Sequence, residues 1–286
     1  MKIHPIQTGT VVIKKNQQVG KGVGAMRLLN MLFGSEWTAS LPILAWVIDH
    51  PEGIIVVDTG ETSRTAQPDY FPRWHPYYRL AVRMTVPPED EIGPQLHRLG
   101  LQPADIKTVV LTHLHTDHAG GLHHFPKSDI YVHSAELAAA RSFQGRITNG
   151  YLPHRWPKWF SPKPIAFQAE QVGPFDHIQY LTRAGDVMIV PTPGHTPNHV
   201  SVIVRQDGVS YFLAGDTTYT EQFLIDRQVD GVSPDKSQAL NTIDKILKYA
   251  TLERTVYLPT HDPSSVKRLE KAQVIMAGEQ QPALTS

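Results

Sequence analysis

The chain has 286 residues, enough for one large domain and marginal for two, and 27 Lys and Arg residues balance 27 Asp and Glu residues. Zero net charge argues against a broad nucleic-acid surface, which needs surplus positive charge on one face. The absence of cysteine excludes disulfides and thiolate metal ligands, and no apolar run of membrane-spanning length or signal peptide is recognisable, so we expect a cytoplasmic protein that does not enter membranes.

Short runs rich in β-branched residues and bounded by Gly, Pro or Asp predict strands along the whole chain. They are Thr10–Lys14, Ile43–Asp49, Ile54–Asp58, Thr108–Thr112, Ile130–His133, Ile178–Leu181, Val187–Val190, Val200–Arg205, Tyr211–Ala214 and Thr255–Leu258. Helical periodicity predicts Glu89–Leu99, Ala135–Phe143, Lys236–Tyr249 and Ser265–Met276, with Ser134 and Ser264 as N-caps. This order predicts an α+β fold in which two sheets pack face to face with helices outside.

Three segments depart from this pattern. Residues 20–37 are too apolar for a solvated loop and should cover a pocket, join a dimer interface or pack as core. Residues 70–84 and 151–167 are rich in aromatic residues, and the second of these holds four prolines, so it is either a fixed loop lining a cleft or a braced surface flap. We expect one domain over residues 1–286, with a disordered tail from about residue 278.

The sequence Thr-His-Leu-His-Thr-Asp-His-Ala-Gly-Gly at residues 112–121 holds four metal-ligand residue types within six positions. These are His113, His115, Asp117 and His118. They follow the apolar run 106–111, so they are expected in a tight loop at the end of a strand, where functional sites tend to lie. Three histidines and an aspartate are hard to bury together without a cation, and the cluster therefore predicts a metal site.

Three more candidate ligands lie downstream, each after an apolar run: His195, Asp216 and His261. In a layered fold these strand ends should place all the candidates along one rim of the sheets. A catalytic zinc ion needs three protein ligands plus water, so five histidines and two aspartates suit two ions better than one.

The motif H-x-H-x-D-H, followed by separate His, Asp and His residues, resembles the metallo-β-lactamase superfamily over about residues 40–262. The resemblance implies a four-layer αββα sandwich and two divalent metal ions. It assigns one ion to His113, His115 and His195 and the other to Asp117, His118 and His261, with Asp216 bridging. Zinc is the expected metal, although nitrogen and oxygen ligands also accept iron, manganese or cobalt. Relatives that use a cysteine ligand are excluded.

Asp58 matches a position of this family and is expected to orient the ligand loop through hydrogen bonds, with a turn cap as the alternative. The ten remaining histidines are interpreted as surface or structural residues. Among them are His123, His124, His133, His154 and His199.

Tyr219 lies three residues after Asp216, as in the quorum-quenching N-acyl-homoserine lactonases that the motif also resembles. This resemblance implies hydrolysis of an acylated lactone by attack of metal-bound hydroxide. Tyr219 would steady the oxyanion and Asp117 would protonate the leaving alkoxide. The alternative for Tyr219 is a packing role on its loop.

The same resemblance suggests that residues of the apolar N-terminal segment shape a groove for the acyl chain. We expect Met26, Leu29 and Phe33 there, joined by Trp156 and Phe160 from the aromatic loop. The extra aromatic residues leave the size and shape of the substrate open. A homodimer is expected by resemblance, with residues 20–37 as a candidate interface.

Other functions remain open on the sequence alone. A phosphotriesterase or aryl esterase would suit the aromatic loops. A glyoxalase-II-like thioesterase normally adds a helical C-terminal region, whereas 25 residues follow His261. Zero net charge disfavours a phosphodiesterase or nuclease, and the full ligand set argues against a binding module that has lost its chemistry.

Overall fold

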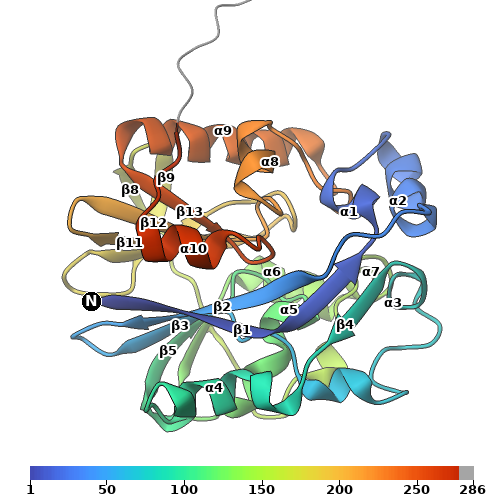
Figure 1. Ribbon diagram of the computed structural model, residues 1–286, viewed down its shortest axis with the longest axis horizontal. Helices are drawn as coiled ribbons and strands as arrows, with labels where there is room; N and C mark the ends of the chain where they lie inside the picture. The colour runs from blue at the N-terminus through green and yellow to red at the C-terminus, as the bar shows by residue number, and fades with distance from the viewer. Residues whose placement is uncertain (277–286) are drawn as a thin grey trace, which may run out of the picture.

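A computed structural model describes residues 1–276, in which two β-sheets pack face to face and helices cover both outer faces (Figure 1). The predicted four-layer αββα sandwich is confirmed. The expected tail from residue 278 lies outside the described residues.

Within these residues the first sheet has the order β4-β1-β2-β3-β5-β6-β7. The strands are β1 (Lys2–Ile13), β2 (Leu41–Asp49), β3 (Ile54–Val57), β4 (Val82–Thr85), β5 (Ile106–Val110), β6 (Asp129–Val132) and β7 (Lys163–Pro164). β1 pairs antiparallel with β2 and β4, whereas β3, β5 and β6 run parallel, so the carboxyl ends of those three meet at one edge.

The second sheet has the order β13-β12-β11-β10-β9-β8 in the described part of the chain. Its strands are β8 (Gln168–Val172), β9 (Phe175–Tyr180), β10 (Val187–Pro191), β11 (Val200–Gln206), β12 (Val209–Gly215) and β13 (Thr255–Pro259). β11 is antiparallel to both β10 and β12, and β12 is parallel to β13. β10, β12 and β13 therefore end at the same edge.

Helices lie outside the sheets and at one end of the molecule. They are α1 (Lys15–Gln18), α2 (Gly24–Phe33), α3 (Pro76–Leu80), α4 (Ile92–Arg98), α5 (Thr116–Ala119), α6 (Ser134–Arg141), α7 (Phe143–Thr148), α8 (Glu221–Ile225), α9 (Lys236–Leu252) and α10 (Ser265–Lys271). Short 3₁₀ turns cover Ser63–Ala66, Pro88–Asp90, Pro103–Asp105, Gly120–His124 and Pro153–Arg155. None of the helices among residues 1–276 has the length and apolar character needed to cross a membrane.

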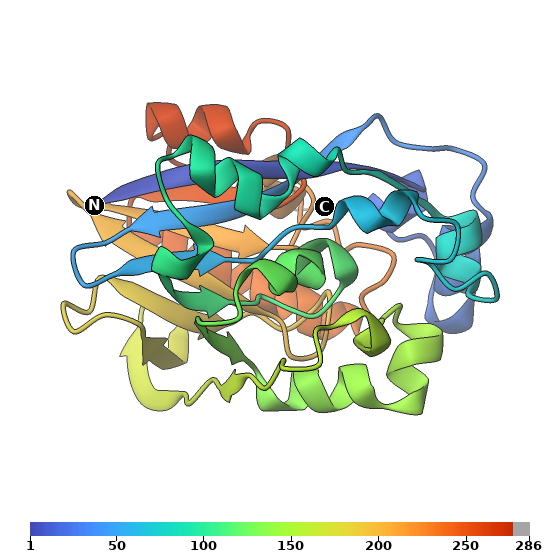
Figure 2. The same ribbon diagram turned by 90° about the horizontal axis from the view of Figure 1, so that it is seen from below.

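The alternation of side chains along the buried strands creates the layers. In β2, Leu44 and Trp46 pack between the sheets, whereas Ala45 and Val47 face the outer layer that contains α4. Residues of β10 divide in the same way between the central layer and the layer under α9. Burying one such aliphatic side chain completely stabilises the folded state by about 1.5–3 kcal/mol relative to leaving it exposed. Figure 2 shows α4, in teal, crossing the outer face of the first sheet.

Local details correct several sequence predictions. The N-cap of α6 is His133, whose side chain accepts from the Ala135 amide, and not Ser134. Ser264 is the N-cap residue of α10 but makes no side-chain cap bond. That helix ends before the predicted Met276 because Ala272 adopts a left-handed conformation. Residues 24–33, whose secondary structure was not predicted, form α2, since Arg27 and Met31 turn one face of this helix inward.

Candidate functional site

The candidate metal ligands lie in loops and on one short helix that follow strands. His113 and His115 come shortly after β5, and α5 presents Asp117 and His118. Because β10, β12 and β13 end at the same edge, the residues that follow them meet there as well; these are His195, Asp216 and His261. The structure thus brings together all seven side chains that the sequence predicted, and all are buried or half-buried.

Two groups of donor atoms form around Asp216. On one side, His115 Nδ1 lies 2.9 Å from His113 Nε2 and 3.1 Å from His195 Nε2. On the other side, His261 Nε2 lies 3.4 Å from Asp117 Oδ2.

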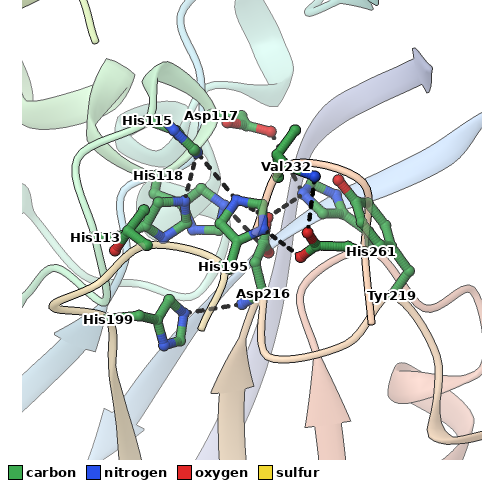
Figure 3. A network of polar contacts seen from close by, with 12 residues as sticks. His113, His115, Asp117, His118, His195, His199, Asp216, Tyr219, Val232 and His261 are labelled. Atoms are coloured by element: carbon green, nitrogen blue, oxygen red, sulfur yellow. Dashed lines mark hydrogen bonds and ion pairs between the residues drawn. The ribbon is translucent and has the colours of Figure 1, made fainter. Parts of the chain in front are cut away.

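The Asp216 carboxylate joins these two groups. Its Oδ1 lies 3.3 Å from His118 Nε2, and its Oδ2 lies 3.5 Å from His195 Nε2 and 3.4 Å from His261 Nε2. Figure 3 shows these rings converging around Asp216.

Each of the five imidazoles is held through the nitrogen that points away from this centre. The outward partners are Thr112 Oγ1 for His113 (3.1 Å), the Asn149 carbonyl for His115 (2.9 Å), Asp58 for His118 (2.8 Å), Asp230 for His195 (2.7 Å) and the Pro42 carbonyl for His261 (2.8 Å). Carbonyl and carboxylate oxygens only accept, so the rings bonded to them carry a hydrogen on the outward nitrogen. The inward nitrogens of neutral rings then present lone pairs, as metal-bound histidines do.

The donor set fits divalent cations. His118 Nε2 and Asp216 Oδ1 are buried and, although they lie 3.3 Å apart, neither makes a hydrogen bond within the described residues. Buried polar groups are rarely left unpaired, so a bound cation is the simplest partner for these two atoms. Three overlapping groups of donors have the proximity needed to hold a metal ion: His113–His115–His195, His113–His118–Asp216 and Asp117–His118–His261.

The electrostatics of the site also favour cations. Burial lowers the pKa of His261, but Asp216 and Asp117 outweigh burial and raise it to about 10. Burial and the neighbouring His195 lower the pKa of His115 to about 4, so this ring is neutral at pH 7. The carboxylates of Asp216 and Asp117 therefore favour positive charge at this centre, whereas a neutral ring such as that of His115 does not supply it. Divalent cations would supply the positive charge and would accept the lone pairs of the neutral rings.

A glycine and a histidine fix the position of Asp216. Gly215 has φ +56°, and a Cβ at this residue would lie 2.5 Å from His199 Nε2, so a side chain is excluded. The Asp216 amide donates to His199 Nε2 at 3.1 Å, and the other nitrogen of that ring lies 2.9 Å from Thr192 Oγ1. His199 is thus a buried structural residue, as expected.

Asp58 lies where its predicted orienting role requires. It follows β3 in a left-handed conformation, with φ 59°. Its Oδ1 accepts from the Thr112 amide at 2.8 Å, and its Oδ2 pairs with His118 Nδ1. One carboxylate therefore holds both the start of the ligand loop and one of its rings.

A pocket opens over the centre. Side chains from β1, α2, α3 and β4 line its apolar side: Val11, Ile13, Met31, Tyr77, Tyr78 and Met84. Tyr219 is also in the wall, where its ring stacks on His261 at a centroid distance of 5.6 Å. Gln17 Nε2 donates to the hydroxyl oxygens of both Tyr219 (2.9 Å) and Tyr77 (3.0 Å).

Five predicted substrate contacts do not line this pocket. Met26, Leu29 and Phe33 are 57%, 46% and 67% exposed, because the inward face of α2 carries Arg27 and Met31 instead. Trp156 lines a separate hollow, and Phe160 packs against it in the outer core. For Met26, Leu29 and Phe33, the direction in which α2 turns its faces, which composition does not reveal, decided the outcome.

Sequence reasoning missed three buried residues that support the site. Asp230 holds His195, and the Arg27 guanidinium donates to the carbonyls of Val229 and Asp230, which fastens α2 to this loop. Gln17 orients two tyrosines. The only sequence signal was the Asp230–Gly231 pair, which is typical of a turn; nothing marked Gln17 or Arg27.

The chain matches proteins of known activity. The metallo-beta-lactamase superfamily matches residues 40–261. The N-acyl homoserine lactonase AttM of Rhizobium radiobacter is 26% identical over 275 residues, which cover 95% of this chain and 97% of the relative.

Two solved structures share the fold. One is an N-acyl homoserine lactone hydrolase with N-hexanoyl-L-homoserine bound at its catalytic metal centre; it superposes with a TM-score of 0.72 at 22% identity, covering 93% of this chain and 95% of its own. The other, the dizinc quorum-quenching lactonase AidC, has a TM-score of 0.63 at 16% identity, with 91% and 87% covered.

Proposed function

The chain belongs to the metallo-β-lactamase superfamily, and on this basis we propose that it is a metal-dependent hydrolase that opens the lactone ring of N-acyl homoserine lactones. The observation that carries the proposal is the convergence of seven ligand-type side chains, with five oriented imidazoles, beneath a pocket walled by Tyr219. Named activities of the relatives supply the substrate class.

Two divalent ions, zinc in our proposal, would be held at this centre. We assign one to His113, His115 and His195, the other to Asp117, His118 and His261, and both to Asp216. When bound, such ions polarise a carbonyl oxygen and make water a nucleophile at neutral pH.

The Tyr219 hydroxyl would hold the carbonyl oxygen of the substrate as negative charge develops on it. Gln17 donates one amide hydrogen to each of Tyr219 and Tyr77, so both phenol hydrogens remain free to point into the pocket. Burial and then the charge of Asp216 raise the pKa of Tyr219 well above its ordinary value, which keeps its proton in place. A fixed donor of this kind stabilises an oxyanion without reorganisation.

Asp117 would carry a proton between the nucleophile and the leaving group. Burial raises its pKa, but His261 and His118 together outweigh burial and lower it to about 2, so the carboxylate is ionised at pH 7. It therefore has to take a proton from the attacking water before it can return one to the ring oxygen. Water adds to the carbonyl carbon, the ring carbon–oxygen bond breaks, and the product is a hydroxy acid.

The apolar wall also favours a second substrate class. Tyr77 and Tyr78 lie edge to face, with centroids 5.2 Å apart, and could pack against an aromatic leaving group. Aryl esters and phosphotriesters are therefore the next substrates to test.

A homodimer and a cytoplasmic location stay predictions. The dimer proposal draws on the exposed apolar side chains of α2 and its N-cap Val23. Light scattering on the purified protein would measure its mass directly, and a monomer would contradict the dimer.

The decisive experiment measures ring opening of short-chain and long-chain N-acyl homoserine lactones by pH-stat, with protein of known metal content, before and after chelation. We expect opening that disappears with the metal and returns on adding zinc. If protein that holds two ions per chain opens neither lactone, the proposed substrate is wrong, and turnover of aryl esters or phosphotriesters would identify the alternative.

A further inference from the structure

A second group of metal-ligand residues lies outside the pocket. Glu91 is the N-cap residue of α4, and His123 and His124 end the 3₁₀ turn Gly120–His124. Glu91 Oε2 lies 2.8 Å from His124 Nε2 and 3.2 Å from His123 Nε2. The two ring centroids are 4.0 Å apart, and one donor atom from each of the three residues lies within 4.8 Å of the other two.

The carboxylate is fixed with one oxygen turned toward this point. Glu91 Oε1 accepts from Thr62 Oγ1 at 3.1 Å and from the Ser63 amide at 2.8 Å, which leaves Oε2 to the histidines. Glu91 is buried, and burial raises the pKa of its carboxyl. Contacts with His123, His124 and Ser63 outweigh burial and lower that pKa below its ordinary range, so the group is negative.

The orientation of His123 matches that of the rings at the main centre. Its Nδ1 lies 3.3 Å from the Gly120 carbonyl, which can only accept, so this nitrogen carries the hydrogen. In the neutral ring, Nε2 then presents a lone pair to the Glu91 carboxylate oxygen. The lone pairs of His123 Nε2 and Glu91 Oε2, 3.2 Å apart, repel each other unless a proton or a metal cation lies between them.

Packing fixes His124 and leaves a path to solvent. A Cβ on Gly93 would lie 2.4 Å from His124 Nδ1, so the ring fills the space that the glycine leaves on α4. His123 and His124 side chains are 29% and 19% exposed, and His123 borders the hollow that also contains Gly120 and Trp156. A cation could enter from that side.

We propose that Glu91, His123 and His124 form a separate site for a divalent transition-metal ion, outside the pocket. Two imidazole nitrogens and one carboxylate oxygen suit zinc, nickel or copper ions and do not suit magnesium or calcium, which prefer oxygen ligands. Three protein ligands leave the fourth position to water from the hollow.

An ion here would tie α4 to the turn that directly follows the ligand-bearing helix α5. Its binding would stabilise the folded chain, since it joins two segments 32 residues apart in sequence (Glu91 to His123). This role is structural and not catalytic, so we expect the ion to bind and to stabilise the fold even if the protein hydrolyses a substrate other than the proposed lactone.

The test counts zinc ions bound per chain by equilibrium dialysis and elemental analysis of the purified protein with its main centre filled. We expect wild-type protein to bind one ion per chain more than His123→Ala. Glu91→Gln, which keeps an acceptor for Thr62 and Ser63, should weaken binding of that ion by about tenfold or more. Excess magnesium should displace none of it.

His177→Ala is the matched control, because His177 is an exposed ring 3.2 Å from the single carboxylate of Asp176. This variant should bind as many ions as the wild type. Zinc should also raise the melting temperature of the wild type and of His177→Ala further than that of His123→Ala. Equal ion counts in wild type and His123→Ala would overturn the proposal and leave a protonated histidine–carboxylate cluster in its place.

Discussion

The two sides of the pocket are built from different parts of the chain. One side carries the candidate metal ligands, which come from loops after strands of both sheets. The opposite side comes from N-terminal strands and helices, with Val11, Ile13, Met31 and Met84 as its apolar residues. Every imidazole of the first side has a second polar contact, whereas Val11, Ile13 and Met84 on the apolar side are held by packing.

This difference separates two properties of the site. Polar contacts fix direction, so a change on the ligand side should alter metal binding and chemistry. Packing contacts are less directional, so a change on the apolar side should alter substrate preference and leave the metal in place. Two polar connections among the described residues join the sides: Asp230 with Arg27, and Gln17 with Tyr219 and Tyr77.

The largest effect is expected for Asp216→Asn, because this carboxylate faces both donor groups. We expect loss of bound metal and a fall in kcat/KM of roughly three orders of magnitude. Elemental analysis measures the bound metal, and the rate of lactone hydrolysis gives kcat/KM. Exposed Asp226→Asn serves as the control, and retention of two ions by Asp216→Asn would refute the bridging role.

Glu61 holds Tyr70, the first residue of the aromatic segment 70–84, and should make the stability of the fold depend on pH. It is fully buried, it accepts from the Tyr70 hydroxyl at 2.8 Å, and burial raises its pKa from 4.5 to about 7. A raised carboxyl pKa favours the folded state fully below pH 4.5, and that contribution is lost as pH rises through about 7. The shift corresponds to about 3 kcal/mol of unfolding free energy.

Glu61→Gln mimics the protonated acid and should therefore gain stability relative to wild type as pH rises across this window. Urea unfolding of metal-free protein at about pH 5 and about pH 8 measures the gain, with exposed Glu89→Gln as the control. A gain of the same size at both pH values would argue against a buried titrating carboxyl.

Asp230→Asn should weaken metal binding by about tenfold to a hundredfold, because it removes the charge that orients His195 through its outward nitrogen. Competition with a chelator measures the affinity. Asp207→Asn is a matched control, since Asp207 is exposed and its left-handed backbone suits asparagine. Unchanged affinity in Asp230→Asn would mean that His195 needs no such support.

Tyr219→Phe should lower kcat by roughly tenfold with unchanged metal content, since one hydrogen bond to the developing oxyanion is lost. Tyr77→Phe removes the other phenol that Gln17 orients and should have the smaller effect. If Tyr219→Phe hydrolyses the lactone at the wild-type rate, Tyr219 is a packing residue.

The smallest effect is expected on the apolar side. Met84→Ala should raise KM for a long-chain lactone by about threefold to tenfold and leave the short-chain substrate and the metal content unchanged. Met26→Ala, on the exposed face of α2, should change neither the KM for the long-chain lactone nor that for the short-chain lactone. If Met26→Ala raised the KM for the long-chain lactone more than Met84→Ala did, the acyl chain would bind along α2, as predicted from the sequence.

The sequence by itself determined the layered fold and the seven candidate ligands. Both depend on signals local in the chain: alternating apolar residues for the strands, and ligand residue types directly after them. The position of Asp216 after an apolar run and a glycine, for example, predicts its place at a strand end without knowledge of the fold.

Only the tertiary structure decided which side chains support and surround those ligands. Gln17 contacts Tyr219 across 202 residues of sequence, and Arg27 reaches Val229 across another 202. No local pattern encodes such pairs. The same holds for the face of α2 that turns Met31 inward and for the pairing of Glu91 with His123 and His124, because each depends on how elements distant in the chain pack together.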